Sequence, residues 1–357
     1  MKILFVFGTR PEAIKMLPIY LKFKQNDIDA KICLTAQHRE MLDDVMDFFE
    51  ISADYDLNLM GKNQTLEELS SLVLKSVGEV LKKEKFDLVF VHGDTTTTFF
   101  SAMAAYYNKI DIAHIEAGLR TYDMYSPFPE EINRQLTSRI AKYHFTPTKI
   151  SKENLLLENL NHKNIYVVGN SVIDALYLTM NKTNLKTKKD KKILITAHRR
   201  ENFGKGIVNI CDAIKKLAEI YKDFEFIYPV HLNPNIQKPV FDMLSNIENV
   251  KLLKPQSYFE FVKLMSESYL ILTDSGGVQE EALSLSKPVL LLRDTTERVE
   301  ALNEGAVKLI GTQTSTIIKE TQKLIDTKIE YEKMTKVSNP YGDGKTSDKI
   351  LEVIKNI

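Results

Sequence analysis

Short apolar runs alternate with longer segments of helical period along almost the whole chain. The runs are rich in Val, Ile, Leu and Phe and have the length of buried strands, which predicts parallel sheets covered by helices on both faces. The expected strands are 2–7, 31–35, 86–92, 111–115, 143–146 and 165–168, followed by 193–197, 225–229, 250–253, 269–273, 288–292 and 307–310. The chain is therefore expected to be an α/β protein.

A polar stretch from Asn181 to Asp190, almost without apolar residues, interrupts this alternation once. A chain of 357 residues commonly holds about two domains. We therefore predict a doubly wound, Rossmann-like domain over 1–180, a linker over 181–191, and a second such domain over 192–357 whose last helix could pack back on the first. In this architecture the two domains would face each other across a cleft, with ligands at the carboxyl ends of the strands.

Composition restricts the classes of ligand. The chain has 48 basic and 48 acidic residues, whereas binders of nucleic acids or membrane surfaces usually carry a basic excess, so neither partner is expected.

Cys33 and Cys211 lie among apolar residues and are expected to be buried, reduced thiols. No apolar run approaches the ~20 residues needed to cross a bilayer, and the first run ends too early for a signal peptide. The cytoplasm is the expected location.

The run 269–273 stops at Asp274-Ser275-Gly276-Gly277, and a segment of helical spacing follows. This order predicts a strand, a turn of the size of a phosphate and a helix. The two glycines let the backbone approach an anion, Ser275 adds a hydroxyl donor, and the first N–H groups of the helix point at the turn. Glu281, about one turn into the helix, could accept hydrogen bonds from a ribose. The segment therefore predicts half of a nucleotide diphosphate site.

The first expected strand runs into a second candidate anion site at Gly8-Thr9-Arg10-Pro11. Gly8 permits a tight turn, Pro11 suits the first turn of a helix, and Arg10 and Lys15 would add cations to a helix start that already favours anions. A capped helix with surface charges is the alternative. The G-x-G-x-x-G pattern is absent, so a nicotinamide cofactor is not expected in this turn.

Three carboxylates of the first half lie where strands should end or helices should begin: Asp94, Glu116 and Glu130. Asp94 precedes a run of four threonines and could equally be a helix N-cap. One such acid is usually a cap, but three that converge on a cleft indicate proton transfer.

In the second half, His198, Arg199 and Arg200 follow one expected strand and His231 follows another, where their charges would suit a phosphate or a departing anion. Solvated loop charges are the alternative. The histidines lack the spacing of metal ligands and no G-x-S-x-G segment occurs, so neither a metal site nor a serine hydrolase is expected.

A set of ordered segments carries a family resemblance. The segments are Phe7-Gly8-Thr9-Arg10-Pro11-Glu12-Ala13-Ile14-Lys15, His92-Gly93-Asp94, Glu116-Ala117-Gly118-Leu119-Arg120, Ser126-Pro127-Phe128-Pro129-Glu130-Glu131, His198-Arg199-Arg200-Glu201-Asn202, Pro229-Val230-His231, Asp274-Ser275-Gly276-Gly277 and Asn339-Pro340-Tyr341-Gly342-Asp343-Gly344. In this order, over nearly the whole chain, they resemble the bacterial non-hydrolysing UDP-N-acetylglucosamine 2-epimerases. The resemblance implies a fold similar to the GT-B glycosyltransferases, a UDP-sugar in the interdomain cleft, and neither metal nor cofactor. It also implies interconversion of UDP-N-acetylglucosamine and UDP-N-acetylmannosamine through elimination and re-addition of UDP, for cell-surface polysaccharide synthesis.

The same resemblance assigns roles to single residues. The carboxylates around the sugar would be Asp94, Glu116 and Glu130, with His198 helping UDP to depart; the ligands of the diphosphate and ribose would be Arg10, Lys15, Ser275, Gly276, Gly277, Glu281 and Arg298. A second UDP-N-acetylglucosamine would bind as an activator beside Gln37, Glu40, Glu130, Arg199 and His231. Two departures from the family pattern, Ala197 for an expected glycine and Glu40 for a glutamine found in some relatives, touch this regulatory expectation most. A homodimer is a further family expectation.

Three other functions stay open at this point. The hydrolysing 2-epimerases release free N-acetylmannosamine and UDP, and the segment from Asn339 to Gly344 favours the non-hydrolysing branch over them. A GT-B glycosyltransferase would need an acceptor. A nucleotide-sugar sensor would bind without turnover.

Overall fold

The computed structural model describes residues 1–35, 39–61, 64–296 and 298–357, and it divides the chain into two compact units. The first unit comprises Met1–Leu178 and Tyr341–Ile357, and the second comprises Thr179–Pro340. The C-terminal 17 residues thus belong to the first unit, whereas the predicted range 192–357 had them in the second domain with only the last helix packing back. Among the described residues, no helix combines the length and apolarity needed to cross a bilayer.

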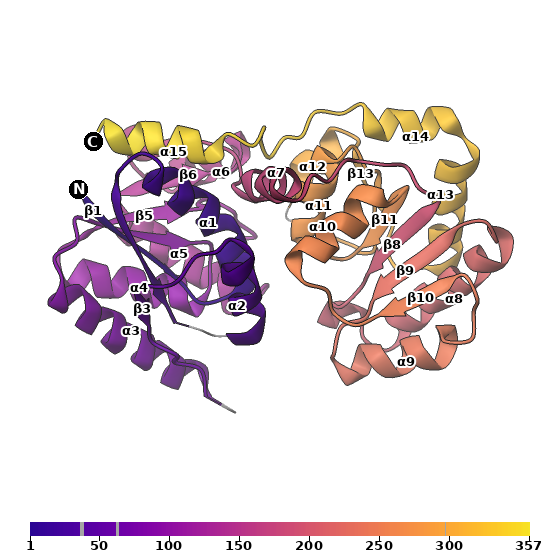
Figure 1. Ribbon diagram of the computed structural model, residues 1–357, viewed down its shortest axis with the longest axis horizontal. Helices are drawn as coiled ribbons and strands as arrows, with labels where there is room; N and C mark the ends of the chain where they lie inside the picture. The colour runs from indigo at the N-terminus through magenta and orange to yellow at the C-terminus, as the bar shows by residue number, and fades with distance from the viewer. Residues whose placement is uncertain (36–38, 62–63, 297) are drawn as a thin grey trace. The chain divides into compact units, whose positions relative to one another are not determined.

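The first unit contains a seven-stranded parallel sheet in the order β3-β2-β1-β4-β5-β6-β7 (Figure 1). Its strands are β1 Lys2–Phe7, β2 Asp29–Leu34, β3 Tyr55–Asp56, β4 Leu88–His92, β5 Asp111–Ile115, β6 Tyr143–Thr146 and β7 Ile165–Val167. The helices that accompany it are α1 Arg10–Lys24, α2 Arg39–Phe48, α3 Leu66–Lys83, α4 Thr96–Tyr107, α5 Glu130–Ile140, α6 Lys149–Leu157, α7 Val172–Thr183 and α15 Thr346–Lys355, with a 3-10 turn at His162–Asn164.

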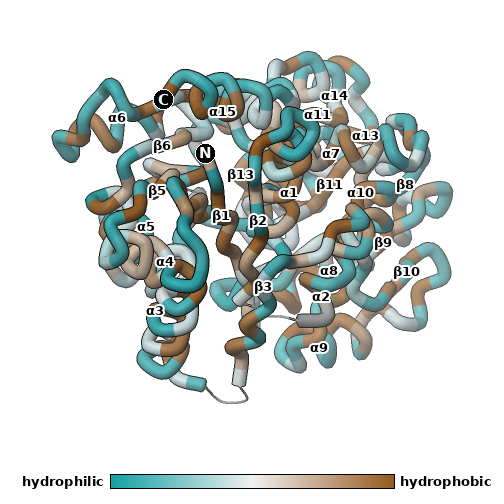
Figure 2. Tube along the Cα trace, turned by 60° about the vertical axis from the view of Figure 1, so that its left-hand side comes forward, coloured by the Kyte–Doolittle hydropathy of each residue, from teal (hydrophilic) through white to brown (hydrophobic). Residues whose placement is uncertain are grey.

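The two faces of this sheet bury different side chains because neighbouring residues of a strand point to opposite sides. Leu4 and Val6 of β1 belong to a core with residues of α3 and α4. Phe5 stacks on Phe90 of β4 at a ring-centroid distance of 4.8 Å and meets Phe23 of α1 edge-on. Figure 2 shows the corresponding hydrophobic stretches along strands such as β1 and β2. Both faces are therefore covered, as the sequence pattern predicted.

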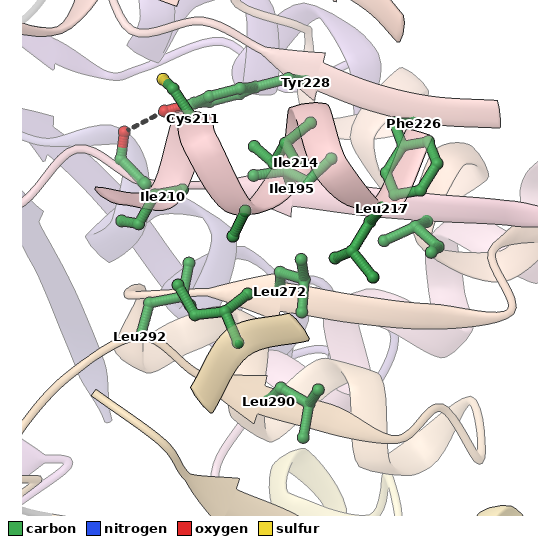
Figure 3. Packing of buried hydrophobic residues seen from close by; sticks show 14 of the residues in the cluster. Ile195, Ile210, Cys211, Ile214, Leu217, Phe226, Tyr228, Leu272, Leu290 and Leu292 are labelled. Carbon is green, nitrogen blue, oxygen red and sulfur yellow. Dashed lines mark hydrogen bonds between the residues drawn. The ribbon is translucent and has the colours of Figure 1, made fainter. Parts of the chain in front are cut away.

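The second unit contains a six-stranded parallel sheet in the order β10-β9-β8-β11-β12-β13. Its strands are β8 Lys192–Thr196, β9 Glu225–Pro229, β10 Val250–Leu253, β11 Leu270–Thr273, β12 Val289–Leu291 and β13 Val307–Leu309. Its helices are α8 Lys205–Ile220, α9 Pro234–Leu244, α10 Tyr258–Glu267, α11 Gly276–Ser284, α12 Val299–Asn303, α13 Thr314–Asp326 and α14 Lys328–Thr335, with a 3-10 turn at Arg200–Asn202. Figure 3 shows one side of its core. There, Ile210, Ile214 and Leu217 of α8 pack against Ile195 of β8 and Leu272 of β11.

Strand order in both units reverses direction at one place. In the first unit the reversal falls between β1 and β4, and in the second between β8 and β11. In doubly wound sheets, ligands bind outside the carboxyl ends of the strands at such a switch point. The segments that follow these four strands begin at Gly8, Gly93, Ala197 and Asp274 and contain most of the predicted site residues.

The structure differs from the expected elements in two places. The strand β3 was not predicted because it has only two residues, Tyr55 and Asp56, and no apolar run. The predicted linker 181–191 begins inside α7, and its later part is held on the second unit, where the Lys188 and Asp190 N–H groups donate to carbonyls of Ser266 and Glu267 at 2.8 and 3.1 Å.

The C-terminal helix α15 is fixed on the first unit from α7. The carboxylate of Asp174, buried in α7, accepts the N–H groups of Thr346 and Ser347 at 3.2 and 2.8 Å. It therefore caps α15 at a helix start that has no side-chain cap of its own. Helix α15 also packs against α1, where Lys22 forms an ion pair with Asp348 at 2.5 Å.

Candidate active site

Asp94 follows β4 through Gly93, whose positive φ of 67° turns the chain at the strand end. The N-cap of α4 is Thr95, whose hydroxyl accepts the Thr98 N–H at 3.1 Å, so the alternative that Asp94 caps this helix was wrong. His114 on β5 holds the turn in place, because its Nε2 lies 2.7 Å from the Gly93 carbonyl oxygen. The carboxylate of Asp94 is thus left available for other contacts.

The main charged partner of Asp94 is Arg134 on α5. The Nη2 atom of Arg134 donates to Asp94 Oδ2 at 2.6 Å, and the side-chain amide of Asn133 donates to the Asp94 carbonyl at 3.0 Å. The pKa of Asp94 is raised to about 6 by several opposing effects. Burial raises this pKa most, the Arg134 guanidinium lowers it, and the carboxylates of Glu116 and Glu130 raise it. Because the charges of Glu116 and Glu130 act on Asp94, the three predicted carboxylates lie near one another in the first unit.

Glu116 follows β5 in a left-handed conformation with φ 59°. Its Oε2 atom forms an ion pair with Lys15 of α1 and accepts the side-chain amide of Asn170 at 2.7 Å. The Nε2 atom of His92 lies 3.8 Å from the same oxygen and is buried. Burial lowers the pKa of His92 to about 4, so this imidazole is neutral near pH 7. Lys15, predicted beside the diphosphate, is thus in contact with Glu116, one of the three carboxylates predicted around the sugar.

Glu130 is the first residue of α5 and directly follows Pro129, as predicted. Its Oε2 atom is buried and, among the described residues, has no hydrogen-bond partner. A buried carboxylate oxygen without a hydrogen bond costs free energy unless a donor reaches it. A hydroxyl or amide N–H group of a bound sugar would be such a donor. The next residue, Glu131, instead serves the structure, because it accepts the N–H groups of Thr121 and Tyr122 at 3.0 and 3.1 Å.

The turn after β1 is tightly packed against the same strand ends. Glu12 accepts the N–H groups of Gly8 and Thr9 at 3.0 and 2.8 Å and the hydroxyl of Thr95 at 2.7 Å. A Cβ atom on Gly8 would lie 2.1 Å from the hydroxyl oxygen of Thr35. Arg10 begins α1 from this turn and is half-buried.

In the second unit, Asp274 organises the switch point. Its Oδ2 atom accepts the N–H groups of His198 and Arg199 at 2.8 and 2.9 Å and the side-chain amide of Asn202 at 2.9 Å. The residue is fully buried, so these charge-assisted bonds fix the loop after β8 to the end of β11. The backbone of the basic loop is therefore constrained, whereas the side chains of His198 and Arg200 are exposed.

His198 and His231 lie face to face at this position. Their ring centroids are 5.6 Å apart with an interplanar angle of 19°. The His198 side chain is 42% exposed, and its Nδ1 lies 3.5 Å from Asp274 Oδ1. Burial, followed by the nearby His198, lowers the pKa of His231. Two histidines from different strand ends thus come together. Arg199 directly follows His198 in the sequence.

The predicted anion turn has the expected order of strand, turn and helix, with β11 ending at Thr273 and α11 beginning at Gly276. The guanidinium of Arg298 lies against this turn: a Cβ on Gly276 would be 2.6 Å from Arg298 Nη1. Arg298 Nε donates to Glu280 Oε1 at 2.7 Å, which holds the guanidinium in place. One helix start and one cation therefore lie together, as an anion site requires.

Glu281, the predicted ribose ligand, is buried on the same helix and accepts the Tyr258 hydroxyl at 2.9 Å. Two of the predicted activator residues cannot be placed: Gln37 lies outside the described residues, and for Glu40 only the backbone, in α2, is described.

Several contacting residues were not assigned a role from the sequence, although Asp274 was noted as part of the anion turn. Arg134, Asn133 and Asn170 each contact one of the three carboxylates or its backbone, and Asp274 holds the basic loop. Asn170 lies shortly after the end of β7. A search for polar residues after predicted strands, which led to Glu116, could also have found it. Arg134 lies in a helix interior, where the sequence carries no comparable signal.

Comparison with known proteins agrees with this geometry. A sequence model of UDP-N-acetylglucosamine 2-epimerase matches residues 22–355. A relative from Neisseria meningitidis with that name is 54% identical, over 99% of both chains. The chain belongs to the UDP-N-acetylglucosamine 2-epimerase family.

Solved members of this family have the same fold. The Neisseria meningitidis enzyme bound to UDP-GlcNAc superposes with a TM-score of 0.94 at 52% identity, covering all of both chains. An enzyme from Methanocaldococcus jannaschii in complex with UDP-GlcNAc and UDP gives a TM-score of 0.85 at 36% identity, again over both full chains. The predicted fold class, two doubly wound sheets of the GT-B-like type, is confirmed.

Proposed function

We propose that this protein interconverts UDP-N-acetylglucosamine and UDP-N-acetylmannosamine without releasing the free sugar. The observation that carries the proposal is the convergence of Asp94, Glu116 and Glu130 in the first unit of a chain from the UDP-N-acetylglucosamine 2-epimerase family. A carboxylate whose pKa is raised by burial and by two neighbouring carboxylates is suited to moving a proton near neutral pH.

The chemistry explains why acids and cations are both needed. The hydrogen at C2 of the sugar is not acidic, so direct deprotonation is too costly. When the C1–O bond to UDP breaks, positive charge develops at C1, C2 loses its proton to a carboxylate, and 2-acetamidoglucal forms. Return of the proton to the opposite face of C2, followed by re-addition of UDP to C1, gives the epimer. Cations around the departing diphosphate stabilise its charge.

The proposal assigns the parts of the substrate to residues of both units. The three carboxylates act on the sugar, and His198 assists the departure of UDP. The proposed ligands of the diphosphate and ribose are Arg10, Lys15, Ser275, Gly276, Gly277, Glu281 and Arg298. The contact of Arg298 with the start of α11 supports its place in this set.

A second substrate molecule is proposed as an activator, with Arg199, His231, Gln37 and Glu40 as its ligands beside Glu130. The stacking of His231 on His198 supports this assignment, since it connects a proposed regulatory residue with a proposed catalytic one. A homodimer is proposed as the assembly.

Product analysis distinguishes this function from its nearest alternative. After incubation with UDP-N-acetylglucosamine, anion-exchange chromatography should reveal UDP-N-acetylmannosamine and no accumulation of UDP. Stoichiometric UDP together with free N-acetylmannosamine would instead identify a hydrolysing epimerase. Turnover only with an added acceptor would identify a glycosyltransferase.

The acid limb of the pH–rate profile should depend on Arg134. Asp94 works as the ionised carboxylate if it accepts the C2 proton or stabilises charge at C1, so kcat should fall as the pH drops through its pKa of about 6. Arg134→Gln removes the guanidinium that favours the ionised form, so the limb should move to higher pH. Arg139→Gln, on the same helix but bonded to the Glu158 carbonyl, is the matched control. An unshifted limb in Arg134→Gln would contradict the assignment.

A further inference from the structure

We propose that Asn170 is a positioning residue for Glu116, and that the C-terminal segment Tyr341–Gly344 acts on catalysis by holding Asn170. The inference rests on the proposed function, because it takes Glu116 as one of the carboxylates that act on the sugar. It assigns a role to Asn170. It also explains physically how the C-terminal segment can affect the carboxylates of the first unit.

The side chain of Asn170 is fixed at both ends of its amide. Its Nδ2 donates to Glu116 Oε2 at 2.7 Å, and its Oδ1 accepts the Val172 N–H at 3.1 Å. The second bond decides which way the amide points, since only the nitrogen can donate to a carboxylate. Asn170 is 3% exposed, so water cannot easily replace either bond.

The next residue, Ser171, holds the other partner of Glu116. Its hydroxyl donates to the Lys15 carbonyl at 2.6 Å, and the Lys15 ammonium forms the ion pair with Glu116. Two consecutive residues after β7 thus contact both members of the Lys15–Glu116 pair. This arrangement constrains a carboxylate whose backbone already has a positive φ.

The C-terminal segment packs directly on this strand end. The Asn170 N–H donates to the Tyr341 carbonyl at 2.6 Å. A Cβ on Gly169, whose φ is 97°, would lie 3.0 Å from the same carbonyl oxygen, and a Cβ on Gly344 would lie 2.3 Å from the Tyr177 ring. Gly169 therefore allows the Tyr341 carbonyl to approach the strand end, and Gly344 allows the segment to pass close to Tyr177. The backbone of Tyr341 sets the place of Asn170, and Asn170 sets the direction of Glu116.

Loss of the amide donor should affect the chemical step more than binding. A proton transfer requires the carboxylate to be held in the productive geometry, and a displacement of about 1 Å can cost two orders of magnitude in rate. UDP is proposed to bind mainly through the second unit, whereas Asn170 belongs to the first. Asn170 variants should therefore lower kcat while KM and the affinity for UDP change little.

Two variants test the inference. Asn170→Asp keeps the shape and the acceptor for Val172 but offers oxygen, not N–H, to Glu116; Asn170→Ser is too short to reach it. For both we expect kcat to fall roughly tenfold to hundredfold, with KM and the dissociation constant for UDP within about twofold. Because Asn170→Asp is isosteric, it reports on the exchange of the N–H donor for a second carboxylate even where Asn170→Ser is less stable.

Thr65→Ala is the control for a merely structural effect. Thr65 caps the start of α3, where its hydroxyl accepts the Glu68 N–H at 3.2 Å, so its loss should lower Tm and leave kcat near the wild-type value. Unchanged kcat in both Asn170 variants would overturn the inference, as would an equal loss of kcat in Thr65→Ala. Wild-type turnover is measured first: its absence would refute the proposed function, whereas an active wild type with active Asn170 variants would refute only the role of Asn170.

Discussion

The Asp94→Asn variant is expected to lose turnover by about a thousandfold while remaining folded, and Glu116→Gln and Glu130→Gln are expected to lose it by a similar factor. Each change keeps the size of the side chain but removes its capacity to accept a proton or to stabilise positive charge. The pKa of Asp94 is raised by burial and further by the charges of the other two carboxylates, so the three side chains interact electrostatically. The measurement is the initial rate of UDP-N-acetylmannosamine formation, with circular dichroism to verify the fold.

The control for loss of a negative charge is Glu153→Gln, an exposed carboxylate on α6 of the same unit. This variant should retain the wild-type rate. Near-normal turnover in all three carboxamide variants would show that the carboxylates do not carry the reaction.

Gly276→Ala is expected to weaken the binding of UDP roughly tenfold to hundredfold, which is the value of one or two charge-assisted hydrogen bonds. The added methyl group would meet the Arg298 guanidinium at 2.6 Å and displace it from the start of α11. A guanidinium end can move more easily than backbone, so the fold should survive. Isothermal titration with UDP measures the effect.

Gly78→Ala provides the matched control, because Gly78 also lies in a helix and its added Cβ would meet nothing within 4 Å. It should leave the affinity for UDP unchanged. If Gly276→Ala bound UDP as tightly as the wild type, Arg298 and the start of α11 would not be the diphosphate site.

The fold was predictable because its signal is local and repeated. Each buried parallel strand needs a continuous apolar run, and each helix needs its own period, so strands such as β9 at Glu225–Pro229 and β10 at Val250–Leu253 lie where they were expected. Strand β3 carries no such signal, since it has two residues and neither is fully buried. The second unit's anion turn was predictable for the same local reason.

The partners of the carboxylates were not predictable, because they come from distant parts of the chain. Arg134 is 40 residues from Asp94, and Asn170 is 54 residues from Glu116. The role of Asp94 itself was ambiguous, because aspartate and threonine are both good helix caps and only the geometry reveals that Thr95 takes that place. Side-chain pairing across a sheet edge depends on packing, which a single sequence does not encode locally.

The central claim is that UDP leaves C1 and the hydrogen at C2 exchanges within one catalytic cycle. Proton NMR of UDP-N-acetylglucosamine incubated with the wild-type protein in heavy water tests it most directly. The account predicts that the C2 proton signal disappears from both the recovered substrate and the UDP-N-acetylmannosamine formed. Formation of the epimer with the original hydrogen retained at C2 would contradict it.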